Sequence, residues 1–238
     1  MYCLAVSLPA NKLTTIAITM INNYLLHPCQ TEKEMTAAVK LRYIAYKNVN
    51  AINENAKEEF TDKYDLLVNS NTCLVYEENA PVASMRACIY SKERAFMELP
   101  SFEVYRHEIE KEIGLDKTIL ECNRFVIHPE KVDSKQLFKI PFRFIILNAL
   151  KFNSDYIISA VRPKHIPLYK RFFGFEPISS PKRYPGLNVE MILMMVDCIH
   201  LPKVMDKEDI FKFTEDEVRS YLPKSGPFPN QLEKLAEI

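Results

Sequence analysis

The chain has 238 residues, with 31 acidic and 31 basic side chains and six cysteines. Balanced charge provides no overall field that would favour nucleic acid or an anionic membrane as a partner. The cysteines are scattered and form no C-x-x-C pair, which indicates free thiols in a reducing cytoplasm. No apolar run approaches the roughly 18 residues of a membrane helix, and the N-terminus lacks the basic start of a secretory signal. We therefore expect a cytoplasmic protein without a transmembrane segment.

The predicted elements alternate between helices and strands, which indicates an α/β (α+β) fold. Thr31 and Glu34 form a capping box at the start of the first helix, and Gly114 suits the end of the second. In chain order, the sequence predicts a helix at 32–49, hairpin strands at 71–78 and 81–90, a helix at 101–116, a strand at 118–128, a helix at 141–152, a strand at 155–163, a short helix at 165–175, a strand at 190–199 and a helix at 207–222.

The strand within ILECNRFVIHPE, residues 119–130, carries Glu121 and Arg124 in otherwise apolar surroundings. Charged side chains are rarely buried unless they are paired or used in function. Strict alternation would place these two residues on opposite faces of the strand, because they are three apart. A β-bulge near 122–126 would bring both side chains to the same face.

Other charged residues also interrupt apolar elements or lie in the loop between them. The full set is Arg42, Asp62, Asp65, Arg86, Glu121 and Arg124. One interpretation is a structural network of ion pairs. The other is a polar pocket that holds both an amino group and a carboxylate. The spacing of these residues leaves both interpretations open.

Several familiar site motifs are absent. The histidines are isolated and HEIEK lacks the second histidine of a zinc-protease motif, so we expect no metal site. With only four glycines, the sequence has no Gly-rich loop of the dinucleotide or P-loop type. It also has no G-x-S-x-G motif. Nucleotide-dependent enzymes and serine hydrolases are therefore poor candidates.

The order of the remaining motifs resembles the long-chain N-acyl amino acid synthases and the related acyl-homoserine-lactone synthases. The matching positions are Arg42 with Tyr46, Asp62 and Asp65 in TDKYD, Arg86 in ASMRA, and Glu121 with Arg124 in ECNRF. The later segment PLYKRFFGFEPI resembles the same part of GNAT-type N-acyltransferases. The resemblance covers about residues 32–197. It implies a GNAT-like mixed, mostly antiparallel central sheet flanked by helices.

This resemblance also implies a domain division and a set of roles. Residues 1–198 would form the acyltransferase domain, and 199–238 would be an extension packed on it. Tyr169 would protonate the departing thiolate, although a tyrosine that only packs on the sheet is the alternative. The acceptor-binding residues would be Arg42, Tyr46, Asp62, Asp65 and Arg86. The sequence has no tryptophan, which favours the amino acid synthase branch over the homoserine-lactone branch.

The chemistry of amide formation suits the strand at 118–128. An amine attacks a thioester only when it is neutral, and a buried Glu121 with a raised pKa can accept its proton. Arg124 is the second predicted catalytic residue. If the strand bulges, backbone N–H groups at Phe125 and Val126 can polarise the thioester carbonyl of the donor.

The donor is predicted from a local excess of basic residues. Lys135, Lys139 and Arg143 lie close together, and the short helix at 165–175 adds further cations. Residues 128–141 contain no glycine that would let the backbone wrap a pyrophosphate, so acyl carrier protein is expected in preference to CoA. An ordinary solvated surface is the alternative. The acyl thioester is a co-substrate, and no permanently bound cofactor is expected.

Three functions remain in competition. The first is transfer of a long-chain fatty acyl group from acyl carrier protein to a free amino acid. The second is synthesis of an acyl-homoserine lactone, or acetyl-CoA-dependent acetylation of an amine. The third is a non-catalytic domain that binds a lipid or a partner.

Overall fold

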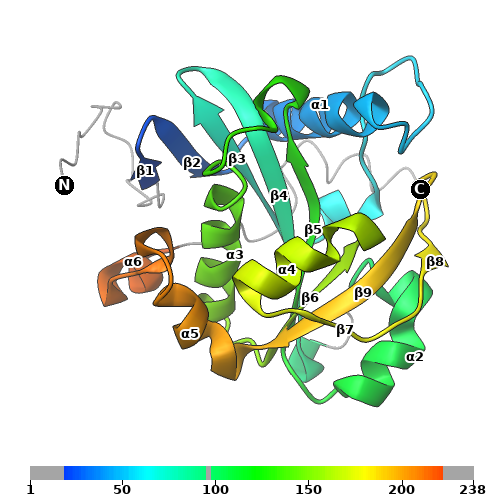
Figure 1. Cartoon of the computed structure of the whole chain (residues 1–238), viewed down its shortest axis with the longest axis vertical. Helices are drawn as coiled ribbons and strands as arrows, with labels where there is room; N and C mark the ends of the chain where they lie inside the picture. Colours follow the sequence, from blue (N-terminus) through cyan, green and yellow to red (C-terminus); the bar gives the residue numbers. More distant parts are fainter. Residues whose placement is uncertain (1–18, 95–97, 222–238) are drawn as a thin grey trace.

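A computed structural model describes residues 19–94 and 98–221 as helices packed on both faces of one sheet (Figure 1). The strands are β1 (Thr19–Ile21), β2 (Tyr24–Pro28), β3 (Ser70–Glu77), β4 (Ala80–Tyr90), β5 (Ile119–Ile127), β6 (Tyr156–Val161), β7 (Glu176–Pro177), β8 (Lys182–Arg183) and β9 (Glu190–Asp197). The helices are α1 (Glu32–Asn48), α2 (Phe102–Glu112), α3 (Ile140–Lys151), α4 (Ile166–Phe173), α5 (Leu201–Met205) and α6 (Glu215–Ser220), with 3₁₀ turns that include η1 (Lys63–Leu66) and η6 (Asp209–Phe211).

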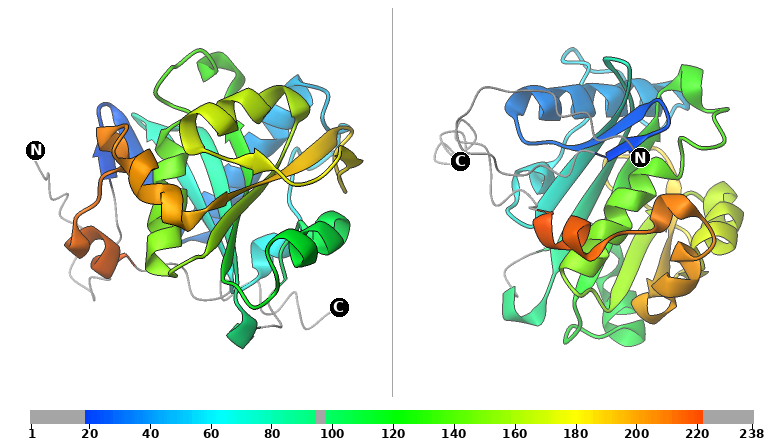
Figure 2. Two further views of the ribbon diagram at one scale, coloured as in Figure 1. Left: turned by 60° about the horizontal axis from the view of Figure 1, so that its bottom comes forward. Right: turned by 90° about the vertical axis from the view of Figure 1, so that its left-hand side faces the viewer.

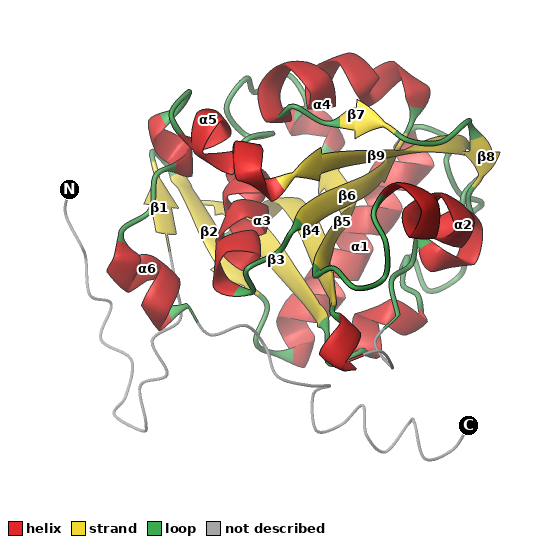
Figure 3. Cartoon of the chain, turned by 90° about the horizontal axis from the view of Figure 1, so that it is seen from below, coloured by secondary structure: helices red, strands yellow, loops and turns green. Residues whose placement is uncertain are grey.

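The strand order is β1-β2-β3-β4-β5-β6-β9-β7, and β8 also pairs with β9. β5 and β6 run parallel, whereas the other described strand pairs are antiparallel. Helices lie on both sides of this sheet in the views of Figures 2 and 3. The prediction of an α/β (α+β) fold with a mixed, mostly antiparallel sheet flanked by helices is confirmed.

Local sequence signals account for the start of α1, the β3–β4 turn and the end of α4. The Thr31 side chain accepts a hydrogen bond from the backbone N–H of Glu34, which completes the capping box of α1. The β3–β4 hairpin turns through Glu78, whose φ is +56°. Gly174 ends α4 in the left-handed conformation, with a φ of +72°, that a residue with a side chain adopts only at a cost.

Alternate residues of the central strands enter different cores, because successive side chains point to opposite faces. Cys88 and Ile119 pack with residues of α2, whereas their neighbours Ala87 and Leu120 pack in the core that contains α3. α1 packs on β3, β4 and β5 from the opposite side to α3 (Figure 2). β6 likewise contributes to both cores, so it is covered on both faces.

The segment after β9 differs from its prediction. Instead of one helix at 207–222, the chain forms η6 and then α6. Lys212 is extended, and Thr214 starts a new helix because its side chain accepts a hydrogen bond from the backbone N–H of Glu217. Residues beyond 221 lie outside the described part. The division of the chain at residue 198 stays a prediction.

Candidate active site

The strand that carries Glu121 contains the predicted bulge. Ser84 of β4 lies opposite Val126, and Arg86 lies opposite Asn123, so three steps along β5 match two along β4. Arg124, within the extra step, has a φ of +53°. This left-handed conformation costs a residue with a side chain about 1–2 kcal/mol. The bulge turns the Arg124 guanidinium toward the face that also holds Arg86.

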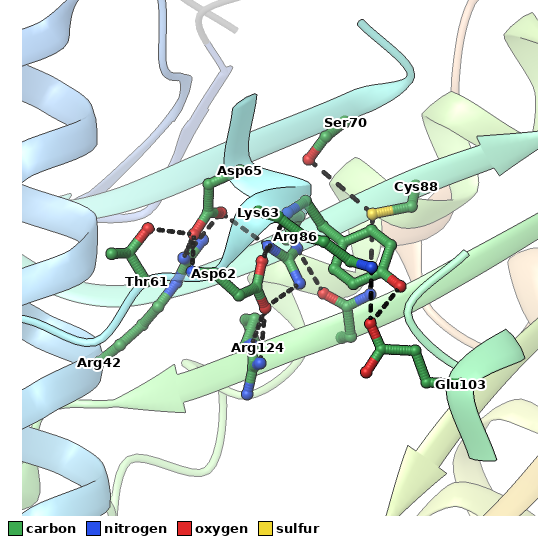
Figure 4. A network of polar contacts seen from close by, with 12 residues as sticks. Arg42, Thr61, Asp62, Lys63, Asp65, Ser70, Arg86, Cys88, Glu103 and Arg124 are labelled. Carbon is green, nitrogen blue, oxygen red and sulfur yellow. Dashed lines mark hydrogen bonds and ion pairs between the residues drawn. The ribbon is translucent and has the colours of Figure 1, made fainter. Parts of the chain in front are cut away.

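Three arginines and two aspartates from separate elements form one network (Figure 4). Asp65 accepts hydrogen bonds from Nη1 of Arg42 and Nη1 of Arg86, both at 2.8 Å. Asp62 accepts from Arg86 at 2.6 and 2.9 Å. Its Oδ2 also accepts from Nη2 of Arg124 at 2.6 Å. The structure therefore brings together five of the charged residues singled out in the sequence.

The two aspartates are held by the turn η1 in the predicted loop. Asp62 caps this turn, and Asp65 accepts hydrogen bonds from the backbone N–H of Asp62 and the hydroxyl of Thr61. The Tyr64 hydroxyl donates to Glu103 of α2 at 2.7 Å. Glu103 also pairs with a lysine of the turn, as Figure 4 shows. The carboxylates are therefore fixed both by their own turn and by the neighbouring helix.

The network lies in a region from which water is largely excluded. The side chains of Arg42 and Arg86 are 0% exposed. Burial alone would raise the pKa of Asp62, but Arg86 and Arg124 outweigh it and lower that pKa to about 2. Arg42 and Arg86 likewise hold the pKa of Asp65 well below its usual range, against the effect of burial. Because three guanidinium groups face two ionised carboxylates, these five groups carry one net positive charge.

Glu121 is fully buried and connects to this network through an amide. Its Oε2 accepts a hydrogen bond from the backbone N–H of Ser101 at 2.9 Å, next to the start of α2. Its Oε1 accepts from Nδ2 of Asn123, whose Oδ1 in turn accepts from Nε of Arg86 at 2.7 Å. Burial raises the pKa of Glu121, while the Ser101 N–H opposes the rise. Asn123 was not predicted as a site residue, although it lies two residues from Glu121 on the same strand face.

Aromatic side chains line the network on its outer side. The Arg124 guanidinium lies 4.6 Å from the ring centre of Phe60, and Tyr46 meets the same ring edge-on at 5.0 Å. Tyr184 is buried nearby, and its pKa is raised by burial and by Glu121. Phe60 and Tyr184 were not predicted, since uncharged aromatic residues give no sign of unusual burial.

Tyr169 lies across the sheet from Glu121. It is buried on α4 against Phe142 and Phe175, with ring centres 5.5 and 5.4 Å away. It shares this core with Cys122, the residue next to Glu121 in β5. β5 and β6 pair over 119–121, so Cys122, which shares the core with Tyr169, is the first residue of β5 beyond this pairing.

The predicted donor residues are not brought to one place. Phe125 packs against Phe142 in the core beside α3, whereas Val126 joins the core beneath α1. Their backbone N–H groups lie at the bulge, and their role at the thioester carbonyl stays a prediction.

The predicted basic surface needs one correction. Lys135 is exposed, but Lys139 forms an ion pair with Glu208. Arg143 is only 6% exposed, and its guanidinium bonds to the backbone carbonyl groups of Ile210 and Lys212 and to a carboxylate of α6. The placement of Arg143 on an accessible rim was therefore wrong, because α3 buries it against the C-terminal segment.

Residues 37–197 match the family described as N-acyl amino acid synthase FeeM. The chain belongs to this family. It is therefore an acyltransferase of the type that includes N-acyl amino acid synthases and acyl-homoserine-lactone synthases, as the sequence motifs predicted. No curated protein matches the chain.

Solved structures show the same GNAT-like fold. FeeM, an N-acyl amino acid synthase from uncultured soil microbes, is 18% identical with a TM-score of 0.62, over 73% of this chain and 89% of that one. BjaI, a CoA-dependent acyl-homoserine lactone synthase, is 14% identical with a TM-score of 0.58, over 90% and 100%. The synthase LasI is 12% identical with a TM-score of 0.56, over 73% and 89%. Within residues 19–94 and 98–221, no helix has the length and apolar character needed to cross a membrane. The cytoplasmic location stays a prediction.

Proposed function

We propose that the protein transfers a long-chain fatty acyl group from an acyl carrier protein thioester to the amino group of a free amino acid. The observation that carries this proposal is the buried network with its net positive charge, joined through Asn123 to Glu121. A zwitterionic acceptor needs a cation for its carboxylate and a carboxylate for its ammonium group. The network offers both within one site.

Arg124 is the proposed partner of the acceptor carboxylate. Its Nε and Nη2 donate to Asp62, while its Nη1 has no acceptor among the described residues. It is also the arginine nearest to Phe60 at the outer side of the network. Asp62, with a side chain 20% exposed, is the more accessible of the two aspartates and suits the ammonium group. Arg42, Asp65 and Arg86 would hold these two residues in place.

The chemical step follows from these positions. The neutral amine attacks the thioester carbonyl carbon, a C–N bond forms and the C–S bond breaks. Glu121 accepts the proton that the amine loses, directly or through water. Tyr169 gives one proton to the departing thiolate, and proton exchange with solvent then restores both side chains. A raised pKa suits Glu121 for this task, because a base with a pKa nearer to neutrality transfers protons more effectively.

Acyl carrier protein is the proposed donor because residues 128–141 contain no glycine and leave Lys135 exposed near the start of α3. Lys164, before α4, is also exposed. These two lysines replace Arg143 as the proposed contacts for an acidic carrier. The likeness to BjaI, which is CoA-dependent, leaves CoA as the competing donor.

The proposal is tested by measuring thiol release from long-chain acyl carrier protein and from the matching acyl-CoA. Each donor is offered a panel of free amino acids, S-adenosylmethionine and spermidine, with the Glu121→Gln variant as control. We expect release only with acyl carrier protein and an amino acid, and little release by the variant. Turnover with spermidine or S-adenosylmethionine but no amino acid would contradict the proposed acceptor. Faster turnover with acyl-CoA would contradict the proposed donor.

A further inference from the structure

The first turn of α2 contacts both the proposed base and the turn that carries the two aspartates. The backbone N–H of Ser101 donates to Oε2 of Glu121 at 2.9 Å. Two residues later, Oε1 of Glu103 accepts a hydrogen bond from the Tyr64 hydroxyl at 2.7 Å (Figure 4). The backbone N–H of Tyr64 in turn donates to Oδ1 of Asp62 at 3.0 Å. A chain of contacts therefore leads from Glu121 to Asp62 by way of α2.

A second chain of contacts joins the same two carboxylates through Arg86. This arginine donates to Oδ1 of Asp62 at 2.6 Å and to Oδ1 of Asn123 at 2.7 Å. Nδ2 of Asn123 then donates to Oε1 of Glu121 at 3.1 Å. The two chains close a ring, so the spacing between Asp62 and Glu121 is fixed from two sides.

The contact between Tyr64 and Glu103 joins a buried donor to an ionised acceptor. Tyr64 is 4% exposed, and its ring centre lies 6.0 Å from the Arg86 guanidinium. Burial raises the pKa of Tyr64, so the phenol keeps the proton that it donates. The same hydrogen bond lowers the pKa of Glu103, which therefore stays ionised. Hydrogen bonds to an ionised acceptor are stronger than those between neutral groups.

The helix α2 is itself held against the sheet. The hydroxyl of Tyr105 donates to the backbone carbonyl of Met191 in β9 at 2.6 Å. Glu108, farther along the helix, forms an ion pair with Lys182 of β8. Because α2 is fixed at these points, Glu103 can hold η1 in place.

We infer that Tyr64 and Glu103 are positioning residues for the acceptor: their hydrogen bond keeps Asp62 and Glu121 at the spacing that one amino group needs. This inference rests on the proposed function. The amino group that Asp62 binds as an ammonium must lose its proton to Glu121. It therefore has to lie within reach of both carboxylates, directly or through one water. Neither Tyr64 nor Glu103 transfers a proton in this step.

The test compares Tyr64→Phe, Glu103→Leu, their double variant and the conservative Glu103→Gln in steady-state kinetics. For each single loss of the contact we expect the acceptor KM to rise about 5- to 10-fold, the effect of one hydrogen bond. The donor KM should change by less than about twofold. The double variant should be no worse than either single variant, because both substitutions remove the same contact.

Two further variants separate positioning from a general effect on the helix. Glu103→Gln should restore most of the acceptor affinity, because its amide oxygen can still accept from the phenol. Glu110→Leu is the matched control, since Glu110 lies on the same helix in an exposed pair with Arg106. It should leave the KM of both substrates unchanged.

Binding of the same amino acids, measured by isothermal titration calorimetry, separates this inference from the proposed function. A wild type that binds an amino acid without turnover would contradict the proposed function, while weaker binding by Tyr64→Phe would still support the inference. An acceptor KM and Kd unchanged in Tyr64→Phe, additive effects in the double variant, or equal rises in the KM of both substrates would overturn the inference. Wild-type turnover would uphold the proposed function in each of those cases.

Two remaining outcomes are also decisive. A wild type that neither binds nor acylates an amino acid would overturn the proposed function and the inference with it. If Glu103→Leu does not fold, Tyr64→Phe and Glu103→Gln provide the comparison, because the first removes a single oxygen atom and the second keeps the size of the side chain.

Discussion

Two buried arginine sites lie on opposite sides of the sheet and differ in the partners that their guanidinium groups bind. On α3, Arg143 donates to the carbonyl groups of Ile210 and Lys212 at 2.6 and 2.7 Å, and also to Glu217. Its guanidinium also lies 4.1 Å from the ring centre of Phe213. These partners belong to one short stretch of chain. Arg143 therefore fixes the C-terminal segment against α3.

The network around Asp62 and Asp65 takes its members from α1, η1, β4 and β5. Each aspartate is shared by two arginines, and the arginines outnumber the acids. A strained residue, Arg124, completes the arrangement. Burial and pairing of a charge therefore do not identify a functional site by themselves. Convergence of distant elements, shared partners and unbalanced charge distinguish this network from the Arg143 anchor.

The largest expected effect is on catalytic activity, which should depend on Glu121 but not on Arg143. Glu121→Gln should lower kcat for thiol release about 10² to 10⁴-fold, the usual contribution of a general base, with the fold retained. Arg143→Met should leave kcat per folded molecule unchanged. Rates are normalised to the folded fraction measured by circular dichroism. Near-normal kcat in Glu121→Gln, together with a large fall in its melting temperature, would show that Glu121 is structural.

Within the network, the outermost arginine should matter most. Arg124→Met should lower kcat/KM about 100-fold, because it removes a desolvated charge that faces the acceptor carboxylate. Arg42→Met and Asp62→Asn should mainly raise the acceptor KM, since we assign these residues to binding. Steady-state kinetics with varied amino acid distinguishes the two outcomes. A KM unchanged in all three variants would place the acceptor elsewhere.

Lowering the pH should destabilise the network around Asp62 and Asp65 more than the contacts of Arg143. The pKa of Asp62 is about 2 in the folded protein, below the unfolded value of about 3.9, so its contribution is present above about pH 5 and is lost as the pH falls toward 2. A shift of this size corresponds to about 2.5 kcal/mol. The stability difference between wild type and Asp62→Asn, from urea unfolding, should therefore shrink by about that amount between pH 6 and pH 2. A constant difference would contradict the ion pairing of Asp62.

Substitution of Arg143 should change the stability of the protein but not its activity. Arg143→Met removes charged hydrogen bonds to two carbonyl groups and should lower the free energy of unfolding by about 2 kcal/mol. Arg106 is the matched control, because it forms an exposed pair with Glu110, four residues later on the same helix. Arg106→Met should change the stability by less than about 0.5 kcal/mol. Equal effects in urea unfolding would mean that Arg143 does not anchor the C-terminal segment.

The smallest expected effect concerns donor docking. Lys135→Glu combined with Lys164→Glu should raise the KM for acyl carrier protein several-fold with little change in kcat, because exposed charges act mainly on the association rate. The effect should fade as salt rises past physiological ionic strength, where the screening length is about 8 Å. Lys33→Glu on α1, a charge reversal at another exposed lysine, is the control. An unchanged KM in the double variant would remove these lysines from the donor site.

The fold and much of the candidate site followed from the sequence, because local rules control them. Capping at Thr31, the left-handed Gly174 and misplaced charges on apolar elements are all visible in one chain. Arg143 was misplaced because its partners are backbone carbonyl groups about 70 residues away, which leave no pattern in sequence. Asn123 and Tyr184 were not predicted as site residues, because an uncharged amide or phenol side chain does not stand out in the sequence as a misplaced charge does. The C-terminal helix was predicted too long because Thr214 starts a new one.

The most direct test of the central claim is the product itself. Purified protein is incubated with long-chain acyl carrier protein and an equimolar mixture of free amino acids, one of them labelled with ¹⁵N in each reaction. Mass spectrometry then measures the acylated products. We predict an N-acyl amino acid that carries the label with the wild type and is nearly absent with Glu121→Gln. A labelled product formed equally by both proteins, or an acyl-homoserine lactone formed when S-adenosylmethionine is supplied, would contradict the account.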